Sequence, residues 1–301
     1  MSSGKNNSAQ RFELVGRELE LSRIRACLKA GRNVLLEGPV GVGKTHLALA
    51  VTRDLGLRVF RVDGDNRYSE QKLAGWFDPP SVVKTGFGAE SFVPGPLVEA
   101  MREGGVLFIN ELNRLPEGVQ NVLLPAIDER LISIPRLGEI RAKENFLVIA
   151  TQNPKEFVAT SHLSEAILDR FELVVLDYQT EEEEVRIVSQ SLARGKNGEK
   201  RLPTAAVRLV RMTRNHPRIR RGASIRAAIS VAEIAQVLMK EGMAFGEAFI
   251  AAVLMALPTR IEIEREAESE RSPRAEVEEL LREWATSVLN EGGGADLKKK
   301  L

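Results

Sequence analysis

Short apolar runs and helically spaced apolar residues alternate over the first 180 positions of the chain. The apolar runs occupy residues 33–37, 58–62, 106–109, 146–150 and 173–176. Short runs of this kind are typical of buried strands, whereas Leu19, Leu21, Ile24 and Leu28 have the spacing of a helix that stops at Gly31. Strands that alternate with helices predict an α/β fold with a parallel five-stranded sheet covered on both faces.

Two stretches between the predicted strands have a character of their own. Residues 75–96 combine glycine and proline with Trp76, Phe77, Phe87 and Phe92. This composition predicts a long structured insertion without a regular element, in which the aromatic side chains can simply anchor the loop by packing. Residues 131–141, centred on Pro135 to Gly138, predict a small hairpin, and Pro116 predicts the start of a helix that runs to about Glu129.

The pattern changes near Asp177. Thr180 and Glu183 have the spacing of a capping box, and helical periods continue from there to about Asn290 without a convincing strand. We therefore expect a flexible leader at 1–9, an α/β core at 10–178, and an α-helical lid with a charged C-terminal helix at 179–301.

The most specific motif follows the first predicted strand. It is a P-loop pattern of two glycines, Lys and a hydroxyl residue, and it reads Gly38-Pro39-Val40-Gly41-Val42-Gly43-Lys44-Thr45. The alternative, an ordinary glycine turn, does not account for the strand before the motif and the helix after it. The motif predicts that the chain binds a nucleoside triphosphate.

Each part of this motif has a physical task. Backbone amides freed by Gly41 and Gly43 can surround phosphate oxygens, and the first turn of the following helix adds its positive end. Lys44 is expected to reach the outer phosphates, and Thr45 to ligate Mg²⁺. The predicted ATP-binding residues are Gly38, Pro39, Val40, Gly41, Val42, Gly43, Lys44, Thr45 and His46.

Polar residues also follow the third and fourth predicted strands, where ligands of parallel sheets collect. Glu111 is a candidate base that could orient the attacking water in line with the γ-phosphate. Asn153 could donate a hydrogen bond to that phosphate or position the same water. Alone, Glu111 could be a strand-end residue in a salt bridge, and Asn153 a turn residue before a proline.

Composition narrows the picture. The net charge is +1, which argues against a global field that attracts nucleic acid or anionic lipid. Cys27 is the single cysteine and the three histidines are scattered, so an intrachain disulfide and a zinc cluster are both excluded. The polar leader has no export signal, and the apolar run at 248–257 is too short to cross a bilayer. We expect a cytoplasmic protein without membrane insertion.

These motifs resemble the AAA+ ATPases, and within them the MoxR-type group. The resemblance runs from about Gly16 to Arg226. Residues 38–45 stand at Walker A, residues 109–114 at Walker B, and Asn153 at sensor 1. Further matches follow in the expected order: Gly95-Pro96-Leu97 closing the insertion, the hairpin at 131–141, a segment at 163–171 that is similar to the one carrying the arginine finger, and a sensor 2 motif at 222–227.

The resemblance implies a ring of six subunits that hydrolyses ATP with Mg²⁺. Arg170 would reach a neighbour's γ-phosphate, and Arg226 would contact the nucleotide of its own subunit. Alternatively, Arg170 pairs with Asp169 or Glu172 of its own chain. The implied partner is a protein client or a von Willebrand factor A domain protein, remodelled in a chaperone-like way. The resemblance also implies that the insertion is a lever or a client-contacting loop.

Two features leave other functions open. Walker B normally has Asp where this chain has Asn110, which can accept a hydrogen bond from a Mg²⁺-bound water but carries no charge. We expect hydrolysis to survive, with a slow or inactive nucleotide switch as the rival hypothesis. The lid also has a row of arginines, Arg208, Arg211, Arg214, Arg218, Arg220, Arg221 and Arg226. We expect this row to contact the next subunit and solvent, whereas a nucleic-acid motor would use it to bind phosphates.

Overall fold

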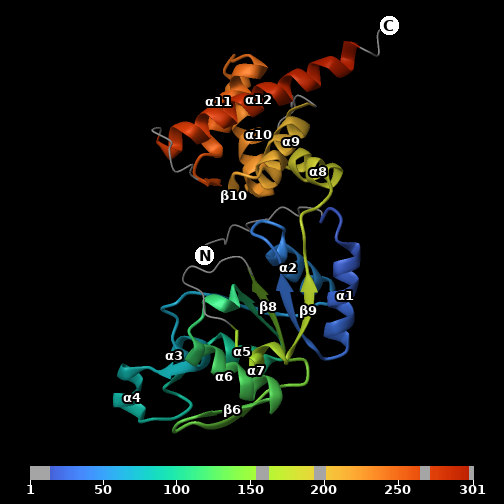
Figure 1. Ribbon diagram of the computed structural model, residues 1–301. Coiled ribbons are helices and arrows are strands. Elements are labelled where there is room, and N and C mark those ends of the chain that lie inside the picture. The colour runs from blue at the N-terminus through green and yellow to red at the C-terminus, as the bar shows by residue number, and fades with distance from the viewer. Residues whose placement is uncertain (1–13, 154–162, 193–200, 265–271, 298–301) are drawn as a thin grey trace, which may run out of the picture. The chain divides into compact units, whose positions relative to one another are not determined.

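A computed structural model of the chain describes residues 14–153, 163–192, 201–264 and 272–297 (Figure 1). The predicted leader at 1–9 lies outside these residues. The described chain forms two compact units. One comprises residues 17–178, and the other comprises the residues from Gln179 onward together with residues 14–16. Each unit is described by itself.

The first unit is built on a parallel sheet of five strands, as the sequence predicts. The strands are β1 (Asn33–Glu37), β2 (Val59–Asp63), β5 (Val106–Asn110), β8 (Leu147–Gln152) and β9 (Phe171–Val175). They lie in the order β2-β5-β8-β1-β9. Since every neighbouring pair is parallel, the carboxyl ends of all five strands lie at one edge of the sheet.

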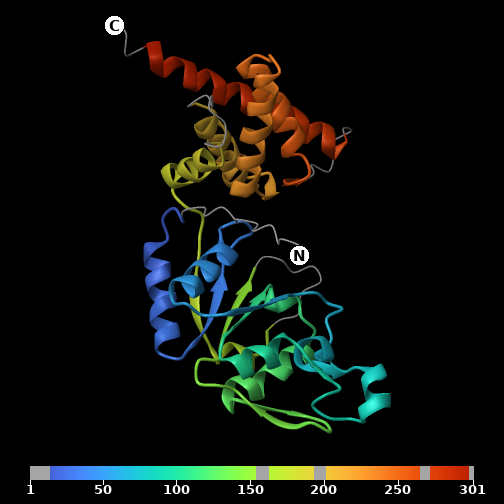
Figure 2. The ribbon, with the colours of Figure 1, turned by 180° about the vertical axis from the view of Figure 1, so that it is seen from behind.

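Helices cover both faces of this sheet (Figure 2). On one face, α1 (Glu18–Lys29) contacts β1 and β9, and α2 (Lys44–Asp54) contacts β5 and β8. On the other face, alternate strand residues join one hydrophobic core with α5 (Pro96–Glu103), α6 (Glu117–Asp128) and α7 (Glu165–Leu168). This alternation follows from the twofold period of a strand, which sends successive side chains to opposite faces.

The prediction that residues 75–96 contain no regular element is wrong. After α3 (Glu70–Ala74), the segment forms the antiparallel strands β3 (Gly75–Phe77) and β4 (Phe92–Pro94) and the short helix α4 (Pro79–Thr85) between them. Asp78 caps α4 by accepting a hydrogen bond from the backbone N–H of Ser81, and two prolines fill the first helical turn. The ring of Phe77 packs edge-on against the rings of Phe87 and Phe92.

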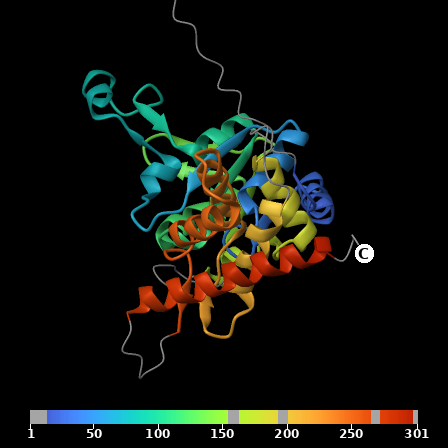
Figure 3. The same cartoon turned by 90° about the horizontal axis from the view of Figure 1, so that it is seen from above.

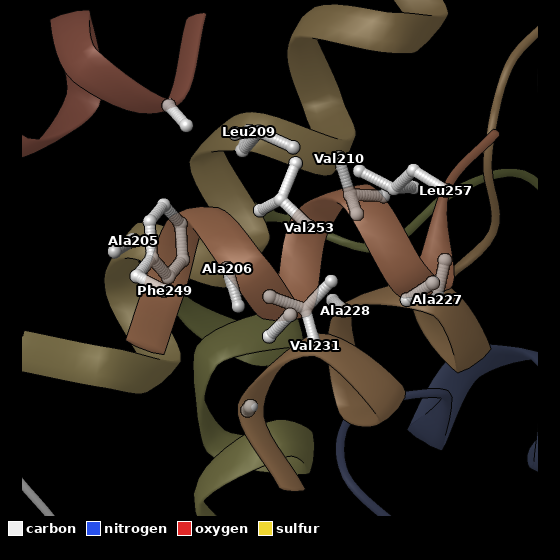
Figure 4. Packing of buried hydrophobic residues seen from close by; sticks show 14 of the residues in the cluster. Ala205, Ala206, Leu209, Val210, Ala227, Ala228, Val231, Phe249, Val253 and Leu257 are labelled. Atoms are coloured by element: carbon white, nitrogen blue, oxygen red, sulfur yellow. The ribbon is translucent and has the colours of Figure 1, made fainter. Parts of the chain in front are cut away.

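The second unit consists mainly of helices. They are α8 (Glu181–Leu192), α9 (Arg201–Asn215), α10 (Ile225–Lys240), α11 (Phe245–Ala256) and the long α12 (Pro273–Leu297), which Figure 3 shows in red. The predicted capping box opens α8: the Glu183 carboxylate accepts from the Thr180 N–H at 3.0 Å, and the Thr180 hydroxyl accepts from the Glu183 N–H at 3.3 Å. The hydrophobic core of the second unit joins α9, α10 and α11, mainly through small and branched side chains (Figure 4).

Two predictions about the smaller strands had opposite outcomes. The hairpin at 131–141 is confirmed, with β6 (Leu131–Ile134) antiparallel to β7 (Gly138–Arg141). The expectation of no strand after Asp177 is wrong, because β10 (Ile219–Arg221) pairs with β11 (Glu262–Ile263). These two strands are short, and they pair across about 40 residues, so neither carries a local signal of its own.

Within the part of the chain that the structure describes, no helix is both long enough and apolar enough to cross a membrane.

Candidate functional site

The P-loop connects the first strand of the sheet to α2, which is the context that its sequence predicts. Gly41 and Gly43 have φ angles of 82° and 93°, in the left-handed region that favours glycine. Gly43 is the N-cap of α2, so Lys44, Thr45 and His46 form the first helical turn. The backbone N–H groups of a first turn have no acceptor within the helix, and together with the helix dipole they favour an anion at this place.

The lysine of the motif lies over its own loop. The Lys44 ammonium donates to the carbonyl oxygens of Gly38 and Pro39 at 2.6 and 2.9 Å. Gly38 packs against the end of the sheet so closely that an added Cβ would lie 2.3 Å from the Leu176 carbonyl oxygen. Arg17 fixes the loop from another side, because its guanidinium donates to the Val42 carbonyl oxygen at 3.3 Å.

Asn110 lies at the centre of a polar cluster at the carboxyl edge of the sheet. Its side-chain oxygen accepts hydrogen bonds from the hydroxyls of Thr45 and Thr151, both at 3.2 Å. Its side-chain nitrogen donates to the Asp63 carboxylate at 3.1 Å. The predicted metal residues Thr45 and Asn110 are therefore in direct contact, and the Asp63 carboxylate lies beside Asn110 on the neighbouring strand β2.

Glu111 follows Asn110 in an unusual backbone conformation. Its φ of 60° is left-handed, which is uncommon for a residue other than glycine and is frequent at functional sites. The Glu111 N–H donates to the Thr151 hydroxyl at 2.9 Å, and this bond holds the conformation. The Glu111 carboxylate accepts from Arg114 at 2.7 Å and is partly exposed, so it is paired and still accessible to water.

Gly64 packs beneath this strand end and allows a prediction. A Cβ at position 64 would lie 2.1 Å from the Glu111 carbonyl oxygen and 3.0 Å from that of Asn110. We expect Gly64→Ala to lower the free energy of unfolding by about 1–3 kcal/mol, because the backbone at Asn110 and Glu111 must shift to make room. Chemical denaturation measures the change. Gly88→Ala is the matched control, since a Cβ at position 88 meets no atom within 4 Å; equal effects of the two substitutions would contradict the packing argument.

Asn153 directly follows β8, one strand from Asn110, as its predicted position requires. It is buried, with 6% of its surface exposed. Its role at a γ-phosphate stays a prediction.

Arg170 is held within its own chain in this structure. Its guanidinium forms a paired contact with the Asp128 carboxylate, with nitrogen-to-oxygen distances of 2.8–2.9 Å, and donates to the Ala166 carbonyl oxygen at 2.7 Å. Asp169 lies 3.6 Å away, as the alternative interpretation expected, but Asp128 is the nearer partner. Contact with a neighbouring subunit stays a prediction, and it would require Arg170 to exchange these partners.

Five arginines of the row form ion pairs within the second unit, which the interpretation of the row did not foresee. The side chains of Arg208, Arg218 and Arg220 are still 45%, 39% and 71% exposed, as the solvated part of that interpretation expects, and contact with a next subunit stays a prediction. Glu184, almost fully buried, accepts from Arg211 at 3.1 Å and from Arg214 at 2.7 Å. Further pairs join Arg208 to Glu181, Arg218 to Glu276 and Arg220 to Glu262. The glutamates lie far from the arginines in sequence, which is why the row looks unpaired when it is read alone. Arg226 is exposed in the first turn of α10, and its contact with a nucleotide stays a prediction.

Sequence reasoning missed two residues of the cluster, Asp63 and Thr151. Asp63 forms hydrogen bonds with Arg61 and with Asn110, and these bonds hold the pKa of its carboxyl below the usual value. Asp63 is therefore ionised at neutral pH. The signal that could have found both residues is their place at the ends of β2 and β8, the strands that flank Asn110.

The strand order and the P-loop after the first strand define the class of the protein as a P-loop α/β protein, with a helical unit that follows in the chain. The protein-family model of the AAA domain (dynein-related subfamily) matches residues 33–171 of the chain. The gas vesicle ATPase GvpN of Haloferax mediterranei is 33% identical over 183 residues, which are 56% of this chain and 53% of that protein. The uncharacterized protein YojN of Bacillus subtilis is 32% identical over 211 residues, which are 69% of this chain and 68% of that protein.

The chain belongs to the AAA+ ATPases, with an AAA domain of the dynein-related subfamily. Among solved structures, a RuvB variant from Thermotoga maritima has the same fold, with a TM-score of 0.57 at 18% identity over 81% of this chain and 71% of that one. The chain spans little more than half the length of GvpN and of a second curated relative.

Proposed function

We propose that the chain is a MoxR-type AAA+ ATPase that binds ATP with Mg²⁺ and hydrolyses it in a hexameric ring of subunits to remodel or mature a protein partner. The observation that carries the proposal is the cluster at the carboxyl edge of the sheet. It brings the P-loop hydroxyl of Thr45 to Asn110 at 3.2 Å and places Glu111 next in the chain.

The residues present suit a magnesium nucleotide. Thr45 and Asn110 offer a hydroxyl and an amide oxygen, and Mg²⁺ prefers oxygen ligands while it keeps several waters. When bound, the ion would supply positive charge that offsets the negative charge of the phosphates. Lys44 would exchange the carbonyls of Gly38 and Pro39 for the outer phosphate oxygens, a stronger charge-assisted contact.

Glu111 is the proposed base. Its carboxylate would accept a hydrogen bond from the attacking water and orient that water toward the γ-phosphate. The salt bridge to Arg114 leaves the second carboxylate oxygen able to accept this bond. Asn153 would donate to the γ-phosphate or to the same water.

The family and several exposed residues support the proposed assembly and partners. AAA+ proteins typically form rings, and in such a ring Arg170 would reach the neighbouring nucleotide while Arg226 senses its own. The insertion exposes Trp76, Val83 and Phe87, at 43%, 87% and 50%, which suits contact with a protein client or a von Willebrand factor A domain protein. Because five of the seven arginines of the row pair with glutamates of their own unit, the row gives little support to a nucleic-acid motor.

A slow or non-hydrolysing nucleotide switch is the second candidate function. The observation that favours it is the neutral amide of Asn110 at the Walker B position. Such a switch would bind ATP with the same residues but would release phosphate no faster than a variant without the base.

The first test compares the unaltered chain with Lys44→Ala. We expect the unaltered chain to bind ATP and to release phosphate, and Lys44→Ala to lose about 10–100-fold in ATP affinity, because one charge-assisted contact is worth about 1.5–3 kcal/mol. Lys29→Ala, at the end of α1, is a control with the same change of charge. An unaltered chain that binds no ATP, or equal affinities of Lys44→Ala and the control, would contradict the proposal.

A further inference from the structure

Three polar side chains lie in a row across the edge of the sheet, and only the outermost carries a charge. Thr45 lies in the first turn of α2, Asn110 ends β5 and Asp63 ends β2. Asp63 and Asn110 are direct partners in the parallel register. The hydrogen bonds from Thr45 to Asn110 and from Asn110 to Asp63 join the row into one chain.

These hydrogen bonds fix the direction of the Asn110 amide. Its oxygen faces the two threonine hydroxyls, and its nitrogen faces the Asp63 carboxylate. A carboxylate at position 110 would place a second negative charge about 3 Å from Asp63, where like charges repel strongly and no N–H would face the Asp63 carboxylate. The Asn110 amide instead donates a hydrogen bond to Asp63, so the two side chains are complementary at this place.

The Asp63 carboxylate can still accept a hydrogen bond beyond those from its protein partners. Arg61, two residues earlier on the same strand, forms an ion pair with it at 2.7 Å, and both side chains are about half exposed. Such exposed pairs contribute little to stability. Arg61 Nη2 and the Asn110 amide both donate to Oδ1 of Asp63, whereas Oδ2 receives only the Arg61 Nε bond that it shares with Oδ1. Oδ2 can therefore still accept a hydrogen bond from water.

We propose that Asp63 supplies the anionic charge of the magnesium site, which the Walker B position itself lacks. Asp63 accepts hydrogen bonds from water ligands of the ion, and it polarises the Asn110 amide so that the amide oxygen becomes a stronger acceptor. In this arrangement the negative charge of the site lies at the end of β2, and the neighbouring strand β5, which carries the Walker B position, ends in a neutral residue. The inference rests on the proposed function, since it concerns the metal that accompanies the nucleotide.

The test measures nucleotide affinity as a function of free Mg²⁺, with a fluorescent ADP analogue as the probe. For Asp63→Asn we expect about a tenfold higher Mg²⁺ concentration at half-maximal enhancement of binding, with unchanged affinity in excess chelator. Asp63→Glu keeps the charge and is expected to stay close to the unaltered chain. Asp65→Asn is the matched control, because Asp65 pairs with Arg67 and has the same change of charge two residues away.

The exchange variant Asp63→Asn with Asn110→Asp returns a carboxylate to the Walker B position. We expect it to recover the Mg²⁺ dependence of the unaltered chain, and thermal unfolding without nucleotide checks that each variant is folded. Equal Mg²⁺ dependence of Asp63→Asn and the unaltered chain, or an equal shift in Asp65→Asn, would overturn the inference while the proposed function stands. If Asp63→Asn does not fold, the exchange variant alone decides. The inference is then overturned if the Mg²⁺ dependence of the exchange variant differs from that of the unaltered chain. An unaltered chain that does not bind the analogue would overturn the proposed function, and the inference with it.

Discussion

Replacement of Glu111 by Gln is expected to lower the rate of ATP hydrolysis about 10²–10⁴-fold while ATP affinity stays nearly unchanged, because a general base contributes this much to the rate. Glutamine keeps the size of the side chain and its bond-accepting oxygen, but it cannot take a proton. The Glu111 backbone bond to Thr151 does not involve the side chain, so the fold of the strand end should survive. Phosphate release at saturating Mg·ATP gives the rate, and equilibrium titration gives the affinity.

Glu129→Gln is the matched control, since Glu129 is an exposed residue at the end of α6 with the same change of charge. It should leave the rate unchanged. If the unaltered chain is no faster than Glu111→Gln, the base assignment fails and the nucleotide switch becomes the better account.

Replacement of Arg170 by Ala is expected to lower the rate about 10³–10⁵-fold, the range that arginine fingers contribute, with ATP affinity retained. The guanidinium would stabilise charge on the transferred phosphoryl group of the neighbouring subunit. Arg170→Lys should not restore the rate, because an ammonium lacks the planar fork of donors. Steady-state phosphate release of the assembled protein checks both variants.

The contact with Asp128 provides the control for this prediction. A structural role of Arg170 would depend on that ion pair, so Asp128→Ala would then lower stability and activity as much as Arg170→Ala does. If Arg170 acts on the nucleotide, Asp128→Ala frees the guanidinium and retains hydrolysis. Similar losses in the two variants would contradict the finger assignment.

Much of the first unit could be predicted from the sequence because its signals are local. The runs that form β1 and β5 are unbroken and apolar, and the P-loop needs its glycines at fixed positions. In the second unit, the capping box of Thr180 and Glu183 is an equally local signal, and the structure contains both of its hydrogen bonds. Such features depend on residues within a few positions of one another.

The features that sequence reasoning missed depend on pairing between distant segments. Asp63 reaches Asn110 across 47 positions, and its partnership follows from the register of β2 with β5. Glu184 neutralises Arg211 and Arg214 only once α8 packs near α9. The two residues of β11 are too few to show a period, so their pairing with β10 becomes visible only in three dimensions.

The account depends most on a nucleotide pocket that two neighbouring subunits share, and a mixing experiment tests this directly. Glu111→Gln and Arg170→Ala are each expected to be nearly inactive alone. In a ring assembled from equal amounts of both, about a quarter of the pockets would combine an intact Glu111 with a neighbour's intact Arg170, so we predict recovery of about a quarter of the unaltered rate. A mixture that stays at the mean of the two single variants, while mixtures with the unaltered chain show that subunits exchange, would contradict the shared pocket.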